Sequence, residues 1–210
     1  MTDSCLCLGI DFGDCHVTAG VCSDAALFGK DILLPVQTHS CNVAVVDADC
    51  NLPDTDAVIT RTPGLRIGVR TADCVPLLLY APDIAAVAAI HAGWKGSLGG
   101  IADRTLELLD GLGANLSLLR AAFGPCICGS CYEVSHELTD EFRAAGFSDC
   151  LVGERNVDLE AVNIRRLLRA GVRRENIKPK SCCTLETPAF PSWRRNCDSR
   201  RLLSWIMLSQ

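Results

Sequence analysis

Three residues of this 210-residue chain, His39, Cys74 and His91, have side chains that commonly bind transition metals. Each stands where the sequence pattern places the end of a strand or the start of a loop, and in α/β folds such positions hold ligands and catalytic groups. Two imidazoles and one thiolate leave the fourth position of a tetrahedral zinc ion open, as a catalytic zinc requires. A water molecule bound there can lose its proton near neutral pH. These residue types therefore predict a catalytic metal site.

The spacing of the three residues leaves other interpretations open. They lie 35 and 17 positions apart in the chain, and no short-range pair of the HxxxH or CxxC type joins them. Taken singly, His39 is typical of an ordinary loop histidine and Cys74 of a packed thiol. Cys74 and His91 would also suit a Cys–His nucleophile pair that needs no metal.

A glycine-rich turn follows His91 over residues 93–100. Backbone N–H groups at such a helix start can hold an anion, and Lys95 adds a positive charge. The turn lacks the Lys-Ser/Thr ending of a Walker loop. Close packing of the backbone would explain its glycines equally well.

A second group of potential metal ligands consists of Cys126, Cys128 and Cys131. A structural zinc site at these cysteines would need a fourth ligand from elsewhere in the chain. The candidates for that ligand are Cys150, Cys182, Cys183 and His136. We favour the simpler interpretation, in which these cysteines are packed or incidental thiols.

Fourteen cysteines are many for a chain of this length. In a small secreted domain they would indicate disulfides, but here they are irregularly spaced and the N-terminus lacks the pattern of a signal peptide. No apolar run reaches the ~18 residues that cross a bilayer. We therefore expect reduced thiols, a cytoplasmic location and no membrane partner.

Positive charge gathers over residues 165–201, where eleven Lys and Arg stand against three Asp and Glu, a net charge of +8. The whole chain carries −5, so the remainder carries −13. Such a stretch could bind nucleic acid or phosphate. Its arginines lack interleaved aromatic residues, however, so we expect a solvated face that neutralises the rest of the molecule and no nucleic-acid partner.

Strand and helix patterns alternate along the chain and surround these residues. Strands are expected at residues 43–47, 57–60, 65–71, 75–80, 85–90, 118–123 and 201–208. Helices are expected at residues 99–109, 135–145 and 158–170. The run at 85–90 is apolar throughout, which suits a strand buried on both faces. No repeat or linker divides the sequence, so we predict one α/β domain over residues 1–210 with a mixed sheet.

Four runs of the sequence resemble motifs of the YfiH or laccase-domain family. They are TADCVPLLLY (71–80), IHAGWKG (90–96), FGPCICGSCYEV (123–134) and SCCTLETPAFPSWRRNCDSRRLLSWIML (181–208). The matching motifs follow the family's order from Gln37 to Arg200. The resemblance implies an α/β sandwich with mixed sheets and one zinc ion held by His39, Cys74 and His91.

The resemblance also implies an enzyme. The family was long labelled multicopper polyphenol oxidase and was later linked to phosphorolysis of adenosine, inosine, guanosine and methylthioadenosine, and to adenosine deamination. For such reactions we expect His39, Cys74 and His91 to be catalytic, with small-molecule substrates. Asp73 would orient a ligand, act as an acid or base, or only close a turn. Positive groups should hold the phosphate, and we nominate Lys95, Arg194 and Arg195.

Other functions compete with this one. A copper-dependent polyphenol oxidase is one alternative, since copper binds N and S ligands more tightly than zinc does. A laccase with several copper centres needs many histidines, however, and this chain has four. A hydrolase that edits peptidoglycan precursors and a non-catalytic metal-binding or partner-binding module are further alternatives. The sequence predicts no particular oligomeric state.

Overall fold

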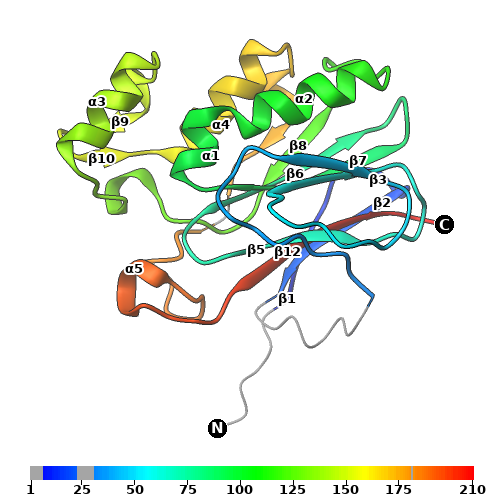
Figure 1. Cartoon of the computed structure of the whole chain (residues 1–210), viewed down its shortest axis with the longest axis horizontal. Helices are drawn as coiled ribbons and strands as arrows, with labels where there is room; N and C mark the ends of the chain where they lie inside the picture. Colours follow the sequence, from blue (N-terminus) through cyan, green and yellow to red (C-terminus); the bar gives the residue numbers. More distant parts are fainter. Residues whose placement is uncertain (1–6, 23–30, 181) are drawn as a thin grey trace, which may run out of the picture.

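The computed structural model describes residues 7–22, 31–180 and 182–210 of the chain (Figure 1). Helices α1, α2 and α4 cover one face of a six-stranded sheet, α3 lies beyond one end of it, and a four-stranded sheet lies on the opposite face (Figure 1). The predicted α/β class with mixed sheets is confirmed. Among the described residues, no helix combines the length and the apolar character that crossing a bilayer would need. The cytoplasmic location stays a prediction.

The six-stranded sheet has the order β11-β8-β6-β7-β4-β3. Its strands are β3 (Val43–Val46), β4 (Ala57–Thr60), β6 (Val75–Ala81), β7 (Ala86–Ala92), β8 (Arg120–Phe123) and β11 (Ile177–Lys178). β3 pairs with β4, and β11 with β8, in parallel, while the central pairs are antiparallel. Every residue of β6 and β7 is buried, and for β7 the unbroken apolar run at 85–90 predicted this.

The four-stranded sheet has the order β1-β2-β12-β5 and is antiparallel throughout. Its strands are β1 (Cys7–Ile10), β2 (Val17–Cys22), β5 (Ile67–Thr71) and β12 (Leu202–Leu208). The six-stranded sheet packs against a hydrophobic core on each of its faces, because alternate residues of a strand point to opposite faces. On β6, Leu77 and Leu79 pack toward the helices, whereas Leu78 and Tyr80 pack toward the four-stranded sheet.

The helices are α1 (Trp94–Gly99), α2 (Ile101–Gly111), α3 (His136–Ala144), α4 (Leu159–Arg169) and α5 (Trp193–Asn196). A hairpin of β9 (Leu151–Val152) and β10 (Asn156–Val157) lies beside α3, and short 3-10 turns occupy Gly129–Cys131, Ser148–Cys150 and Arg174–Asn176. The side chains of Ser135 and Asp158 accept hydrogen bonds from the first turns of α3 and α4. The predicted N-cap at Ser135 is therefore confirmed.

Several elements were not expected from the sequence. The helix expected at 99–109 is present as α2, but α1 before it was not expected, and Gly100, with a φ of 87°, ends α1 in the left-handed conformation. The strands β1 and β2 were not expected, since their short stretches contain glycines and polar residues. The helix α1 matters for function because it begins three residues after His91.

Candidate metal centre and active site

The fold brings His39, Cys74 and His91 together, although they come from three segments. Cys74 ends the crossover from β5 in one sheet to β6 in the other, and His91 lies near the end of β7. Because Pro76 of β6 pairs with His91 of β7, the start of β6 lies beside the end of β7. One ligand atom from each of the three residues lies within 4.8 Å of the others. Cys74 Sγ is 3.9 Å from His39 Nε2, and the two imidazole centroids are 4.8 Å apart.

A fourth residue, Asp56, fixes the two histidines in place. Its carboxylate lies 2.6 Å from His91 Nδ1 and accepts hydrogen bonds from the backbone N–H groups of Thr38, His39 and Ser40 at 2.7–3.1 Å. A carboxylate can only accept, so Nδ1 of His91 carries a proton toward Asp56 and Nε2 is the ring nitrogen that a metal can bind. His39 has a φ of 64°, a conformation that a histidine rarely adopts, and the hydrogen bonds to Asp56 offset its strain.

Asp56 was not nominated from the sequence as a site residue. It is fully buried and directly precedes β4, and its only signal is a carboxylate at the edge of an apolar strand. Such a residue is rarely buried unless it is paired. A functional role for such a carboxylate can be inferred only when a cationic or metal-binding partner is known to lie nearby.

The pKa values of Cys74 and His91 are shifted by the groups around them. Burial raises the pKa of the Cys74 thiol, but hydrogen bonds from His39 and His91 outweigh it and lower that pKa to about 6. Burial lowers the pKa of His91, but Asp56 and Cys74 outweigh it and raise that pKa to about 9. The pKa of Asp56 lies far below its ordinary range, because hydrogen bonds from His91 and Ser40 outweigh the effect of burial. At neutral pH the metal-free site therefore contains a Cys74 thiolate beside a protonated His91, and a bound metal would displace the His91 Nε2 proton.

Gly93 leaves room for this arrangement. A Cβ atom at Gly93 would lie 2.8 Å from Cδ2 of His39 and 3.2 Å from Sγ of Cys74. The first of these distances is shorter than a van der Waals contact allows. The glycine that precedes α1 is therefore required by the ligand side chains rather than by an anion cradle.

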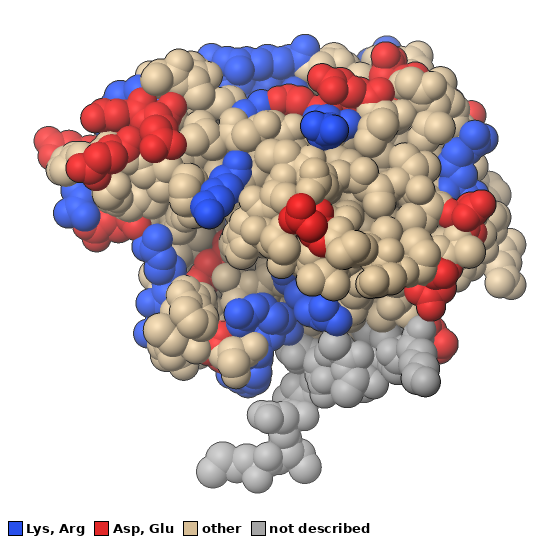
Figure 2. Space-filling view, viewed as in Figure 1, with Lys and Arg blue, Asp and Glu red and all other residues tan. Residues whose placement is uncertain are grey.

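A pocket of about 700 Å³ opens onto the three ligand residues. It is lined by Pro35, Val36, Gln37, His39, Arg70, Thr71, Ala72, Asp73, Cys74, His91, Trp94, Tyr132, Leu159, Trp193, Arg194 and Arg201. The ligand residues thus share one cavity with three arginines and three large aromatic rings. Figure 2 shows Lys and Arg side chains around the hollow beside α5 on this face. Such a cavity suits a small anionic or aromatic ligand.

Asp73 lines the pocket, but its two carboxylate oxygens are engaged. Oδ1 accepts a hydrogen bond from the Thr184 hydroxyl at 2.7 Å, and Oδ2 accepts one from the backbone N–H of Arg194 at 2.7 Å. The Arg194 guanidinium stacks on Tyr132, with its central carbon 4.6 Å from the ring centroid. Of the roles expected for Asp73, the geometry favours orientation of a neighbour, Arg194, over acid–base chemistry.

The structure does not bring Lys95 and Arg195 into this pocket, contrary to their nomination as phosphate-binding residues. The Arg195 guanidinium donates hydrogen bonds to the backbone carbonyls of Thr184, Leu185 and Thr187 at 3.1–3.2 Å, so its donors are directed at the protein. Lys95 is exposed on α1, where its Nζ lies 5.5 Å from the Trp94 ring centroid. Of the three nominated cations, Arg194 alone lines the pocket.

Arg70 and Arg201 line the pocket and escaped the sequence analysis. Arg70 lies on β5, where the amide of Gln37 pairs with its backbone N–H and carbonyl at 2.8 Å. Arg201 directly precedes β12, and its guanidinium lies 5.9 Å from the Trp193 ring. The sequence places both within expected strands, at 65–71 and 201–208, but does not indicate which part of the four-stranded sheet faces the metal ligands.

Comparison with known proteins decides the family. A family model described as "Multi-copper polyphenol oxidoreductase laccase" matches residues 18–209. This chain belongs to that laccase-domain family. The resemblance drawn from the sequence motifs is thereby confirmed.

Curated relatives of this laccase-domain protein are named as enzymes of purine nucleosides. "Adenosine deaminase RL5" from an unknown prokaryotic organism is 39% identical over 183 residues, which span 79% of this chain and 70% of the relative. "Purine nucleoside phosphorylase" from Deinococcus radiodurans is 41% identical over 144 residues, which span 67% of this chain and 56% of the relative. Because these relatives are named as enzymes, the prediction that this chain is an enzyme is confirmed.

The fold also has solved counterparts. The crystal structure of Bacillus licheniformis hypothetical protein YfiH superposes with a TM-score of 0.84, at 27% identity, and covers 92% of this chain and 93% of that one. The sandwich implied by the resemblance is therefore the architecture of this laccase-domain protein.

The donor set of the laccase-domain site fits a transition metal. Two imidazole nitrogens and one thiolate sulfur are ligands that zinc and copper both accept. The side chains are half-buried or buried on one wall of the pocket, except for the more exposed His39. Three protein ligands facing a cavity leave a coordination position for a substrate or water, which distinguishes a catalytic site from a closed structural one.

Replacing Gly93 with Ala is expected to displace His39 and Cys74 and to weaken metal binding at this site at least ~10-fold, because misplaced supporting groups typically cost 10–100-fold in affinity. The measurement is zinc affinity by competition with a chromophoric chelator. Gly111→Ala at the end of α2 is the matched control, since a Cβ atom there meets nothing within 4 Å. Equal affinities for the two variants would contradict the account of Gly93.

The pH dependence of thiol alkylation should reveal the Cys74 thiolate in the metal-free protein. With a pKa of about 6, Cys74 should react with iodoacetamide at a rate that is half-maximal near pH 6 and falls as the pH decreases below it. Cys150, whose pKa burial raises to about 11, should stay unmodified at that pH. Peptide mass spectrometry measures both. A midpoint above pH 8 for Cys74 would show that the two histidines do not stabilise its thiolate.

Proposed function

We propose that this protein is a zinc-dependent phosphorylase of purine nucleosides, including adenosine, inosine, guanosine and methylthioadenosine, with adenosine deamination as a second activity. The observation that carries the proposal is one cavity that joins three metal-ligand side chains, three arginines and three aromatic rings. The names of the curated relatives support the same substrate class.

The pocket contains aromatic rings that can bind the purine base and arginines that can bind phosphate. The faces of Trp94 and Trp193 offer apolar surface on which a purine base can stack, while Tyr132 carries the Arg194 guanidinium. The guanidinium groups of Arg70, Arg194 and Arg201 can donate charged hydrogen bonds to phosphate oxygens. A nucleoside and a phosphate would thus be held in the same cavity, which is the geometric requirement for reaction between them.

Phosphorolysis transfers the ribosyl group from the base to phosphate. A phosphate oxygen forms the new bond to ribose C1′, the C1′–N9 bond breaks, and its electron pair leaves with the purine. Arg194 would hold the attacking phosphate, and Asp73 keeps the backbone of Arg194 in position. Zinc held by His39, Cys74 and His91 would supply a Lewis acid at this wall of the pocket.

The orientation of the ligand residues is prepared by the protein itself. Asp56 holds the His91 ring with Nε2 toward Cys74 and holds the loop that carries His39. Such prepared groups need no reorganisation when the reaction begins. In adenosine deamination the same wall would face the purine C6 amino group and the attacking water.

The test of the proposal is the product formed from inosine in the presence and absence of phosphate. Phosphate-dependent release of hypoxanthine together with ribose 1-phosphate is expected. Adenosine without phosphate should yield inosine and ammonia. If no purine nucleoside turns over in a phosphate-dependent way, the phosphorylase proposal is wrong.

Replacing Arg194 with Gln should raise the KM for phosphate about tenfold or more, because a charged hydrogen bond contributes about 1.5–3 kcal/mol. The backbone N–H that binds Asp73 is unaffected by this change. Lys95→Gln is the matched control, since Lys95 is exposed and does not line the pocket. Initial rates at varied phosphate concentration give the KM of both variants. A larger rise in KM for Lys95→Gln than for Arg194→Gln would contradict the assignment of Arg194 as the phosphate-binding residue.

Copper-dependent oxidation of phenols is a second candidate function, favoured by the description of the family and by the N and S donors of the site. Copper stands above zinc in the Irving–Williams order. This function predicts oxygen consumption with a phenol in proportion to bound copper. The chain has only four histidines, so it cannot supply the many imidazoles of a laccase with several copper centres.

A further inference from the structure

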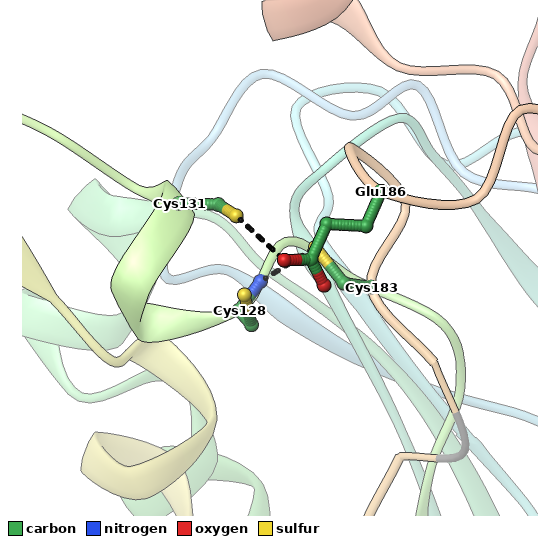
Figure 3. Close-up of side chains that lie close together, drawn as sticks. All are labelled: Cys128, Cys131, Cys183 and Glu186. Carbon is green, nitrogen blue, oxygen red and sulfur yellow. Dashed lines mark hydrogen bonds between the residues drawn. The ribbon is translucent and has the colours of Figure 1, made fainter.

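A second cluster of ligand side chains lies outside the pocket, between two short turns of the backbone. Cys128 and Cys131 stand three residues apart around the 3-10 turn Gly129–Cys131, and Cys183 and Glu186 stand three residues apart in a later turn. Figure 3 shows the four side chains directed toward a common point. Two facing turns with ligands three residues apart form a recurrent arrangement for binding a metal.

The distances within this cluster suit tetrahedral coordination. One ligand atom from each residue lies within 4.8 Å of all the others. Cys131 Sγ is 3.5 Å from Glu186 Oε1, and the backbone N–H of Cys128 donates to Cys183 Sγ at 3.3 Å (Figure 3). A zinc ion with bonds of about 2.3 Å to sulfur places neighbouring ligand atoms roughly 3.8 Å apart. The cluster therefore needs only small movements to enclose an ion.

The backbone holds both turns in place independently of any ion. Cys126 forms a β-bridge with Cys183, and Thr184 N–H donates to the Cys126 carbonyl at 3.1 Å. The later turn is closed by Thr187 N–H donating to the Cys183 carbonyl at 3.0 Å. Arg195 then donates to three carbonyls of the same turn, which gives this arginine a structural role.

Three thiol sulfurs and one carboxylate oxygen lie within 4.8 Å of one another in this cluster. So many electron-rich atoms in one place repel each other once they ionise, and a divalent cation between them would remove that repulsion.

We propose that Cys128, Cys131, Cys183 and Glu186 bind a second zinc ion, separate from the one at His39, Cys74 and His91. Three thiolates select a soft metal, and the carboxylate oxygen favours zinc over copper(I). Four protein ligands close the coordination sphere, so this ion is structural. The proposal departs from the interpretation of Cys128 and Cys131 as packed thiols, while Cys126, which is fully buried, keeps that role.

The cluster lies beside Asp73, so a bound ion would stabilise one wall of the active-site pocket. Ile127 N–H donates to the Asp73 carbonyl at 3.0 Å, and the Thr184 hydroxyl donates to the Asp73 carboxylate at 2.7 Å. Both turns therefore contact Asp73, the neighbour of Cys74 and the anchor of Arg194. An ion between the turns would fix this wall of the pocket.

The test is zinc content per chain in protein purified under reducing conditions and saturated with zinc. The wild type should bind two ions, and Cys74→Ala should bind one. Cys183→Ser should also bind one, and the double variant none. Cys50→Ser is the matched control, since Cys50 is exposed and outside both clusters, and it should bind two. These counts do not depend on which substrate the enzyme takes.

Cobalt and thermal unfolding give two further readouts in the Cys74→Ala background. Bound Co²⁺ should show a strong thiolate charge-transfer absorption, which the added Cys183→Ser change should abolish. A chelator should lower the melting temperature of Cys74→Ala by about 5 °C or more, because only the folded chain forms the site.

Glu186→Gln is a second variant that keeps all the thiols and alters only an exposed side chain. It should fold and should bind the second ion at least ~10-fold more weakly. One zinc in the wild type and none in Cys74→Ala would overturn the proposal. A Cys128–Cys131 disulfide in place of zinc in the reduced protein would overturn it as well.

Discussion

Replacing Cys74 with Ala is expected to lower the turnover of inosine phosphorolysis at least ~1000-fold and to remove the ion at His39, Cys74 and His91. Loss of a Lewis acid from an active site removes several kcal/mol of transition-state stabilisation, which corresponds to a factor of this size. Cys74 is the only anionic ligand of the three, so two neutral imidazoles would hold zinc weakly. Steady-state kinetics and metal analysis of the purified variant measure the two effects.

The matched control is Cys50→Ala, which removes an exposed thiol that does not line the pocket and should leave both properties unchanged. Metal-free wild type separates the metal mechanism from a Cys74–His91 nucleophile pair. Full turnover in metal-free wild type, with turnover still lost in Cys74→Ala, would favour the nucleophile pair and reject a catalytic metal.

Replacing Asp56 with Asn is expected to destabilise the fold by about 3–5 kcal/mol, because removing one partner of a buried ion pair leaves the other uncompensated. Asp56 is fully buried beside His91 and also accepts three backbone N–H groups of the loop around His39. An amide in its place has one accepting oxygen and brings two donors that the site cannot satisfy. Urea denaturation measures the free energy of unfolding.

Metal affinity should fall in the same variant, since the tautomer of His91 is no longer fixed by a carboxylate. Asp54→Asn is the matched control because Asp54 lies two residues away on the surface and binds Asn42 at 2.9 Å, an interaction that an amide can retain. If Asp54→Asn proved as destabilising as Asp56→Asn, the special role of Asp56 would be refuted.

The ligand residues could be nominated from the sequence because their chemistry is restrictive. Few side chains bind zinc, and His39, Cys74 and His91 stand at strand ends within motifs of the family. Their supporting residue Asp56 could not be nominated, since a carboxylate before a strand is usually a solvated turn residue. Its importance arises from burial, which the pairing of β4 with β7 creates.

The cations were predicted less well than the metal ligands. Lys95 and Arg195 have the right charge and the right motifs, but charge does not show where a long side chain points. Arg195 is directed into a turn that it stabilises, while Arg70 and Arg201 enter the pocket from the second sheet. This outcome depends on how two sheets pack, which local sequence patterns do not encode.

The second cluster shows a similar limit. Cys128, Cys131 and Cys183 were considered from the sequence as ligands, whereas Glu186 was not, because acidic residues are common on every surface. The β-bridge between Cys126 and Cys183 is what brings Glu186 to the cysteines. Contacts over such a separation in sequence become visible only in the folded chain.

The most direct test of the central claim is inosine phosphorolysis by metal-depleted enzyme titrated with zinc, alongside the Cys74→Ala variant. The account predicts that chelation abolishes phosphate-dependent hypoxanthine release, that zinc restores it in the wild type, and that zinc restores nothing in Cys74→Ala. Undiminished turnover after complete metal removal, or equal restoration in both proteins, would contradict a catalytic zinc at His39, Cys74 and His91.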